Sequence, residues 1–179
     1  MKKRDFRRGK VMGISVFGAL CALTLTAGQV WAQFASATNT TAQQFGPPPA
    51  IGGGGCGVKT IDVNGAAAGN CLTINFPVAG PLVALFNAEC TVAGLTDTKW
   101  LDVNVLVNGV AAAPSDGDNA FCTSTGDGAL EHWVSASTNV IRQVGAGIHT
   151  ICVTANLVGC TPNVDAFRLD DISLIAFRP

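Results

Sequence analysis

The sequence has no tyrosine, only two histidines and few charged residues. Lys, Arg, Asp and Glu make up 13% of its 179 residues, whereas 48% are apolar. Disordered chains are rich in charge and poor in apolar residues, so this composition excludes wholesale disorder. With two histidines and few aromatic side chains, it also limits the chemistry that the protein can perform.

Basic residues are scarce outside the N-terminus. Six of the 11 lysines and arginines lie within the first ten residues. Without that segment the chain carries five basic and eleven acidic residues, a net charge of −6. Proteins that bind nucleic acid need clustered basic residues to neutralise phosphates, so this balance excludes nucleic acid as a partner.

The first 32 residues have the organisation of a secretory signal peptide. A basic segment at residues 1–10 precedes an apolar segment at residues 11–26, and Val30 and Ala32 place compact residues before a cleavage site at Gln33. The apolar segment is shorter than the roughly 20 residues of a membrane-spanning helix. We therefore expect an exported protein that is secreted, periplasmic or at the cell surface, with no membrane span in the mature chain.

Six cysteines follow the leader, an even number that indicates up to three disulfides in an exported protein. Spacing alone leaves their connectivity open. We predict Cys152–Cys160 across a short loop, Cys90–Cys122 between strands and, by elimination, Cys56–Cys71. Zinc is not indicated, because the sequence has no C-x-x-C pair and no histidine at ligand spacing from a cysteine.

Residues 33–56 contain no charged residue and include runs of proline and glycine at residues 47–49 and 52–55. Such a stretch cannot bury enough apolar surface to offset the entropy lost on ordering. We therefore predict a flexible tether at 33–56, followed by one folded domain at 57–179.

The folded domain shows alternation of apolar and other residues with a period of two, which is typical of β-strands. The clearest segments are residues 72–78, 84–92, 101–107 and 149–157. Asn108-Gly109 predicts a hairpin turn, and segments 58–63 and 71–76 are expected to form another hairpin. Seven to nine short strands without helices indicate an all-β fold: an antiparallel β-sandwich of jelly-roll or Greek-key type, with disulfides.

The last strand changes phase. Phe167 and Leu169 are apolar at odd positions, whereas Ile172 and Leu174 are apolar at even positions. A one-residue shift would turn the core face outward, so we predict a β-bulge at the intervening Asp170-Asp171.

The segment at residues 167–174 resembles the last strand of secreted carbohydrate-binding modules with a jelly-roll fold. Residues 147–153 are similar to the penultimate strand of such sandwiches. The resemblance covers about 20 residues and implies a sandwich fold, glycan binding and a structural calcium ion held by Asp170 or Asp171. The Asn-x-x-Phe-Glu opening that usually supplies further ligands is absent, and no other cofactor is expected.

Trp100, Asp102 and Asn104 share one face of their predicted strand. Sugars stack on exposed aromatic rings flanked by hydrogen-bonding groups, so these residues are the candidate ligand site. The alternative is a tryptophan packed under a neighbouring loop. Further acids (Asp116, Asp118, Asp127 and Glu131) suit either calcium or ordinary turns.

Catalysis has the least support. Ser135, His149 and Asp170 could supply a triad, but no G-x-S-x-G elbow frames the serine. We therefore predict that the protein is not an enzyme, and a secreted hydrolase is the weakest alternative.

The main hypothesis is a surface structural or self-associating protein, because abundant Ala, Val and Gly with few charges suit packing between subunits. The alternative is a glycan- or small-ligand-binding module with an extracellular glycan or protein partner.

Overall fold

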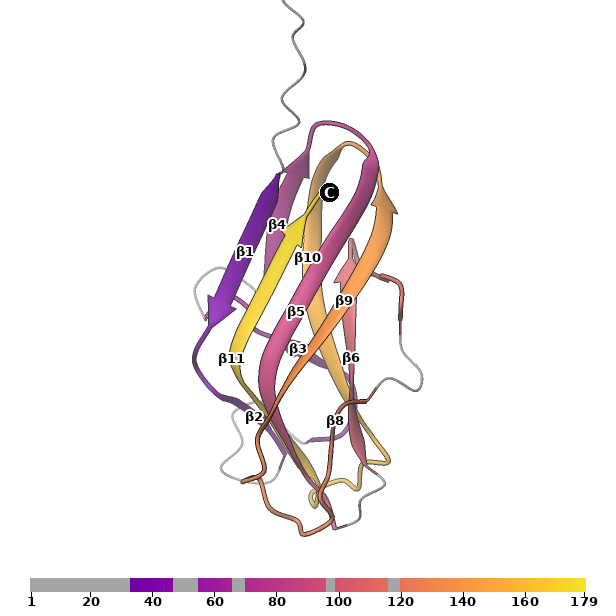
Figure 1. Ribbon diagram of the computed structural model, residues 1–179. Coiled ribbons are helices and arrows are strands. Elements are labelled where there is room, and N and C mark those ends of the chain that lie inside the picture. The colour runs from indigo at the N-terminus through magenta and orange to yellow at the C-terminus, as the bar shows by residue number, and fades with distance from the viewer. Residues whose placement is uncertain (1–32, 47–54, 66–69, 96–98, 116–119) are drawn as a thin grey trace, which may run out of the picture.

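The computed structural model describes residues 33–46, 55–65, 70–95, 99–115 and 120–179 (Figure 1). These residues form eleven strands and no helix. Sheet A contains β1 (Phe34–Asn39), β2 (Gln43–Phe45), β5 (Gly80–Ala93), β9 (Val134–Val144) and β11 (Ala166–Phe177). Sheet B contains β3 (Lys59–Ile61), β4 (Cys71–Phe76), β6 (Trp100–Val107), β7 (Val110–Ala111), β8 (Ala120–Thr123) and β10 (Gly147–Val158).

The strands of both sheets pair in the antiparallel sense. Sheet A has the order β1-β11-β5-β9, and β2 also pairs with β11. Sheet B has the order β3-β10-β6-β7, with β4 on β10 and β8 on β6. Figure 1 shows the two sheets packed face to face as an elongated sandwich. The predicted fold class, an all-β antiparallel sandwich with disulfides, is confirmed.

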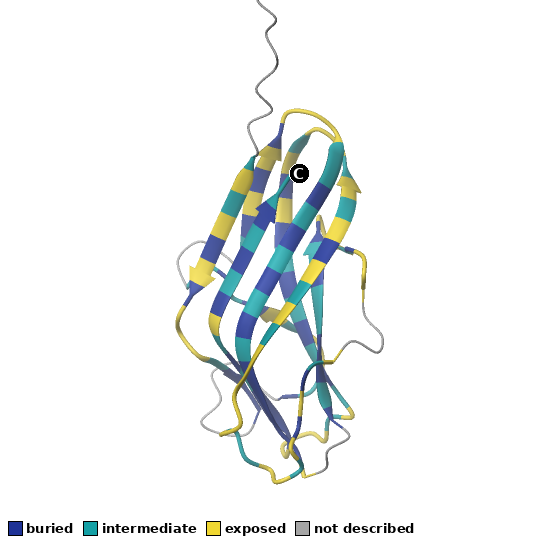
Figure 2. Ribbon diagram, in the orientation of Figure 1, coloured by how far each residue is buried: buried dark blue, intermediate teal, exposed yellow. Residues whose placement is uncertain are grey.

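The core follows the predicted alternation (Figure 2). On β5, Leu82, Ala84 and Phe86 are fully buried while the residues between them are only partly covered. The predicted inward residues of β10 are likewise buried. Asn108 and Gly109 adopt φ angles of 53° and 77° in the turn between β6 and β7, which confirms this hairpin.

The predicted bulge is also confirmed. The register between β11 and β5 shifts between Asp170 and Ser173, and Asp171 has a φ of 45°. Because of this shift, Leu169 and Ile172 are both buried although they differ in parity.

The predicted hairpin between segments 58–63 and 71–76 is wrong. Both β3 and β4 pair with β10, lying end to end along it at Val153–Ala155 and Gly147–Cys152. A hairpin between the two short strands would leave this edge of the twelve-residue β10 without backbone partners, a condition that folded proteins avoid.

The predicted tether is wrong where the structure describes it. β1 forms a continuous ladder with β11, and Phe45 of β2 stacks on Phe167 with ring centroids 4.8 Å apart. Backbone pairing with a long strand needs no charged or large side chains, so composition alone missed it. The predicted signal peptide at 1–32 and the Pro/Gly run at 47–54 lie outside the described residues.

Two of the three predicted disulfides are wrong. Cys90 pairs with Cys122 as predicted, but Cys71 pairs with Cys152 and Cys56 with Cys160. Cys152 and Cys160 cannot meet because β10 runs extended to Val158 and, at about 3.3 Å per residue, carries the chain roughly 20 Å away. Cys71 and Cys152 are instead direct neighbours on β4 and β10, with Cα atoms 4.4 Å apart.

In the described part of the chain, no helix is long and apolar enough to cross a membrane.

Candidate functional site

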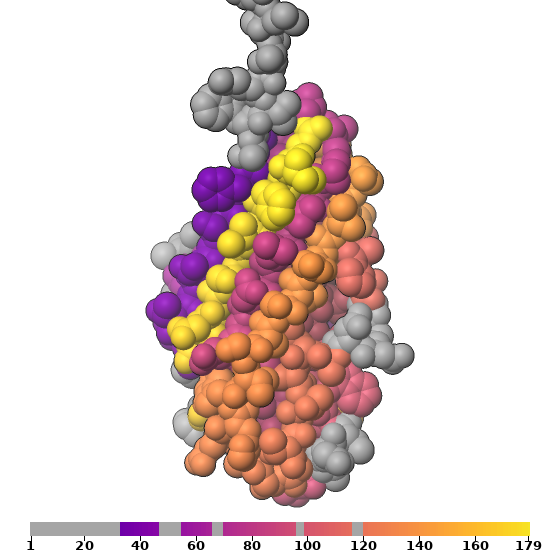
Figure 3. All heavy atoms as spheres, viewed as in Figure 1, coloured from indigo at the N-terminus to yellow at the C-terminus, as the bar shows by residue number. Residues whose placement is uncertain are grey.

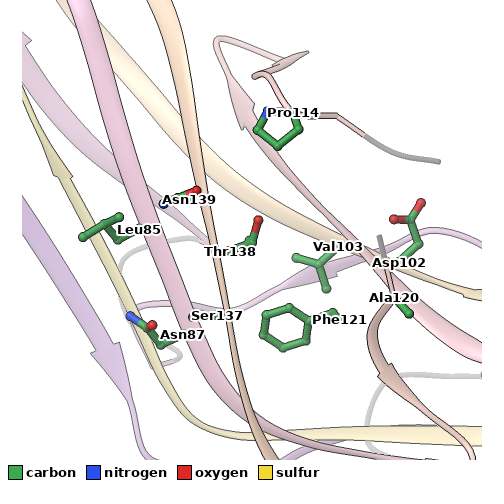
Figure 4. A pocket seen from close by; sticks show the side chains of 10 residues that line it. All are labelled: Leu85, Asn87, Asp102, Val103, Pro114, Ala120, Phe121, Ser137, Thr138 and Asn139. Carbon is green, nitrogen blue, oxygen red and sulfur yellow. The ribbon is translucent and has the colours of Figure 1, made fainter. Parts of the chain in front are cut away.

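A pocket of about 640 Å³ surrounds the middle of β9, with lining residues on both sides of that strand (Figure 4). Sheet A contributes β5 and β9 to its wall, and sheet B contributes β6, β8 and the segment after β7. The lining residues are Leu85, Asn87, Asp102, Val103, Pro114, Ala120, Phe121, Ser137, Thr138 and Asn139. Its volume lies within the range of roughly 300–1,000 Å³ typical of small-ligand sites.

The strand registers explain how sheet A positions its polar residues. Asn87 lies directly opposite Ser137, and Leu85 lies opposite Asn139. Because Ala84, Phe86 and Ala88 on the same strand point into the core, these residues face away from sheet B. The amides and hydroxyl are thereby held on a rigid two-strand ladder.

The other wall is mainly apolar. Phe121 of β8 packs against Phe86 with ring centroids 5.4 Å apart, which fixes its position between the sheets. Pro114 follows Ala113, whose backbone N–H and C=O both bond to Ile141 of β9 at 3.1 and 2.7 Å. Figure 4 shows Val103 and Phe121 on one side of β9, and Leu85 and Asn87 on the other.

The pocket carries little charge. Among the described lining residues only Asp102 is ionisable, and it is buried. The remaining polar groups (Asn87, Ser137, Thr138 and Asn139) are neutral amides and hydroxyls that can both donate and accept hydrogen bonds. A neutral ligand rich in hydroxyl groups matches these hydrogen-bonding side chains.

A second hollow of about 410 Å³ lies on the outer face of sheet A. Glu89, Ser135 and Asp171 line it together with Asn87 and Ser137, which also line the first pocket. The two hollows therefore meet at the middle of β9.

The structure places only one of the three ligand residues predicted from the sequence in the pocket. Asp102 lines the pocket, whereas Trp100 and Asn104 do not. Trp100 is half-buried, and its indole Nε1 is buried without a hydrogen-bond partner among the described residues. Asn104 lies between Val103 and Val105 on β6, opposite Thr154 of β10.

Sequence reasoning missed Asn87, Ser137 and Asn139. The available signal was the polar alternation of β9 at Ser135, Ser137 and Asn139, but only the pairing with β5 shows that Asn87 joins them.

The predicted calcium residues occupy the bulge. The Asp170 Oδ1 atom accepts a hydrogen bond from the Asp171 backbone N–H at 2.8 Å. Within the described residues, no group of three or more His, Cys, Asp or Glu side chains is placed to share a metal ion. Calcium at Asp170 or Asp171 stays a prediction.

The second acidic group is only partly described, since Asp116 and Asp118 lie outside the described residues. Asp127 is exposed and accepts hydrogen bonds from the Ala129 backbone N–H, the Thr125 hydroxyl and His132. These bonds lower the pKa of Asp127 to about 2. Asp127 thus acts as a turn-stabilising residue.

The three residues of the hypothetical triad lie in different sheets, and the histidine is bonded to other groups. His149 is buried in sheet B, where its Nδ1 lies 2.9 Å from Asn108 Nδ2 and its Nε2 lies 3.0 Å from the Gly145 carbonyl oxygen. Both ring nitrogens are thus engaged by structural groups. Ser135 and Asp170 belong to sheet A, on β9 and β11.

No family model and no curated protein sequence matches this chain. Among solved structures it is similar to a family 35 carbohydrate-binding module from Clostridium thermocellum, with 15% identity over 79% of this chain and 96% of that one, and a TM-score of 0.33. It is also similar to a carbohydrate-binding module of Cellvibrio mixtus lichenase 5A in complex with cellotriose, with 16% identity over 81% of this chain and 97% of that one, and a TM-score of 0.33. A third similar structure is dimeric latent PorU from Porphyromonas gingivalis, with 15% identity over 82% of this chain and 12% of that one, and a TM-score of 0.42.

Proposed function

We propose that this protein is a non-catalytic binding module that takes a short neutral saccharide in the pocket along β9. The observation that carries the proposal is that one pocket is lined by neutral hydrogen-bonding residues on one side of β9 (Asn87, Ser137 and Asn139) and by apolar residues, including Phe121, on the other. Sugars present hydroxyl groups at their rim and C–H groups on their ring faces, so they need both kinds of contact.

The proposal favours binding over chemistry. Glycoside hydrolysis requires two carboxyl groups flanking the bond that is cleaved. Asp102 is the single carboxylate among the described residues of this pocket. The same lining offers no Lys, Arg or His to hold an acidic sugar, so neutral saccharides are the preferred class.

Isothermal titration calorimetry tests this proposal with cellotriose as the neutral probe and trigalacturonate as the acidic one. We expect cellotriose to bind and trigalacturonate not to bind. Asn139→Ala should weaken binding roughly two- to tenfold, since a lost hydrogen bond costs roughly 0.5–1.5 kcal/mol. Thr150→Ala, an exposed change on sheet B, is the matched control and should bind as the wild type does.

Absence of measurable binding of any neutral trisaccharide at millimolar concentration would refute the proposal. The Trp100 face is a second candidate, because Trp100, Asp102 and Asn104 share the outer side of β6. Equal affinity of wild type and Asn139→Ala, together with loss of binding in Trp100→Ala, would move the site there.

A further inference from the structure

We infer that β9 pairs edge to edge with β9 of a second copy of this chain, in an antiparallel two-fold contact centred on Ser137. The inference concerns assembly and does not depend on saccharide binding.

The first observation is the length of the exposed edge. β9 pairs with β5 through eleven consecutive residues without a bulge. The other outer strands (β1, β2, β3, β4, β7 and β8) contain six residues or fewer. Short edge strands are one means by which proteins prevent sheets from joining, and the eleven-residue β9 is not short. Figure 3 shows β9, in orange, running beside β5 across this face of the molecule.

The second observation is the direction of the backbone groups. In an antiparallel ladder, alternate residues direct both N–H and C=O away from the neighbouring strand. Ile141 bonds outward to Ala113 through both groups, so Ser135, Ser137 and Asn139, which share its parity, also direct theirs outward. All three residues are exposed, and no described residue bonds to these outward backbone groups.

The third observation is that β9 lacks the usual protection of an edge. It contains no proline and one charged residue, Arg142. The Arg142 guanidinium donates a hydrogen bond to the Ala111 carbonyl oxygen at 2.9 Å, so its charge does not lie at the edge near Ser137. Charged side chains, prolines and bulges are the devices that normally keep such edges apart.

The segment fits a second copy of itself. A two-fold axis at Ser137 places Ser135 of each copy opposite Asn139 of the other, with no charged side chain between them. Each of these pairs can exchange two backbone hydrogen bonds. The ladder is confined to residues 135–139 of each copy, because Ala113 already occupies the edge at Ile141.

Sedimentation equilibrium of the mature protein tests the contact. From micromolar to millimolar concentration, we expect the average mass to rise from one copy towards two. Ser137→Lys should keep the protein monomeric, because the axis sets the two ammonium groups against each other. Thr150→Lys adds the same charge to an exposed position on sheet B and should dimerise as the wild type does.

A second experiment tests the register. Ser137 meets its own copy at the axis, so Ser137→Cys should oxidise to a covalent dimer, whereas Ser135→Cys should not. Circular dichroism would confirm that each variant remains folded. A wild type that stays monomeric at millimolar concentration, or equal dimerisation of Ser137→Lys and Thr150→Lys, overturns the inference.

Discussion

At the scale of single residues, the buried ion pair between Lys99 and Asp165 has the clearest energetic consequence. Both side chains are almost inaccessible to solvent, and Lys99 also bonds to the Thr161 hydroxyl at 3.1 Å. Burial alone would raise the pKa of Asp165, but hydrogen bonds from Lys99 and the Thr161 backbone outweigh it and hold that pKa below its ordinary 3.8. The pair fixes the chain just before β11 begins.

Asp165→Asn should therefore lower the free energy of unfolding by about 3–5 kcal/mol, because it leaves the Lys99 ammonium buried without a counter-charge. Urea denaturation at pH 7 measures the change. Asp171→Asn is the control: Asp171 is exposed, and asparagine tolerates its positive φ, so stability should stay within about 0.5 kcal/mol. A loss below 1 kcal/mol in Asp165→Asn would contradict the assignment.

The pH dependence provides an independent check on the same pair. Since the folded state lowers the pKa of Asp165, the carboxylate contributes fully above about pH 4 and loses its contribution as pH falls through the folded pKa. Wild-type stability should decline below pH 4 more steeply than that of Asp165→Asn.

At the scale of elements, sequence periodicity predicted which residues face the core but not which strands are neighbours. Alternation identified the inward side of β5 and β10 and the bulge in β11, because burial imposes the same period wherever a strand lies in the sheet. It could not predict that β1 joins β11, or that β3 and β4 share β10, since backbone hydrogen bonds leave no mark in the sequence. The wrong disulfides follow from these wrong neighbours.

The bulge offers a test at this scale. Asp171 has a φ of 45°, a conformation that costs a residue with a Cβ atom roughly 1–2 kcal/mol and glycine almost nothing. Asp171→Val should destabilise the protein by about that amount or more, whereas Asp171→Gly should match or exceed wild-type stability. Thermal unfolding of both variants measures this difference. Equal unfolding midpoints of Asp171→Val and Asp171→Gly would show that the bulge moves elsewhere when Asp171 is replaced.

At the scale of the whole molecule, the candidate site depends on contacts between distant segments. The pocket combines residues from β5, β6, β8 and β9, and Cys90–Cys122 ties β5 in sheet A to β8 in sheet B. Of the predicted site residues, only Asp102 belongs to it, because sequence analysis searched along one strand for a site that four strands assemble. Ser137 lines both hollows and stands at the centre of the free edge of β9.

Saccharide binding and self-association should therefore exclude each other, since both need the surface around Ser137. If a ligand binds only the single copy, its presence at ten times its Kd weakens dimerisation by about 100-fold, because both copies must release it. Sedimentation equilibrium with and without cellotriose measures this shift, with trigalacturonate as the control that should leave the dimer unchanged. By reciprocity, raising the protein concentration should weaken the apparent affinity for cellotriose. Unchanged dimerisation at saturating cellotriose would show that one of the two contacts lies away from β9, and the Asn139→Ala and Ser137→Lys variants would identify which one.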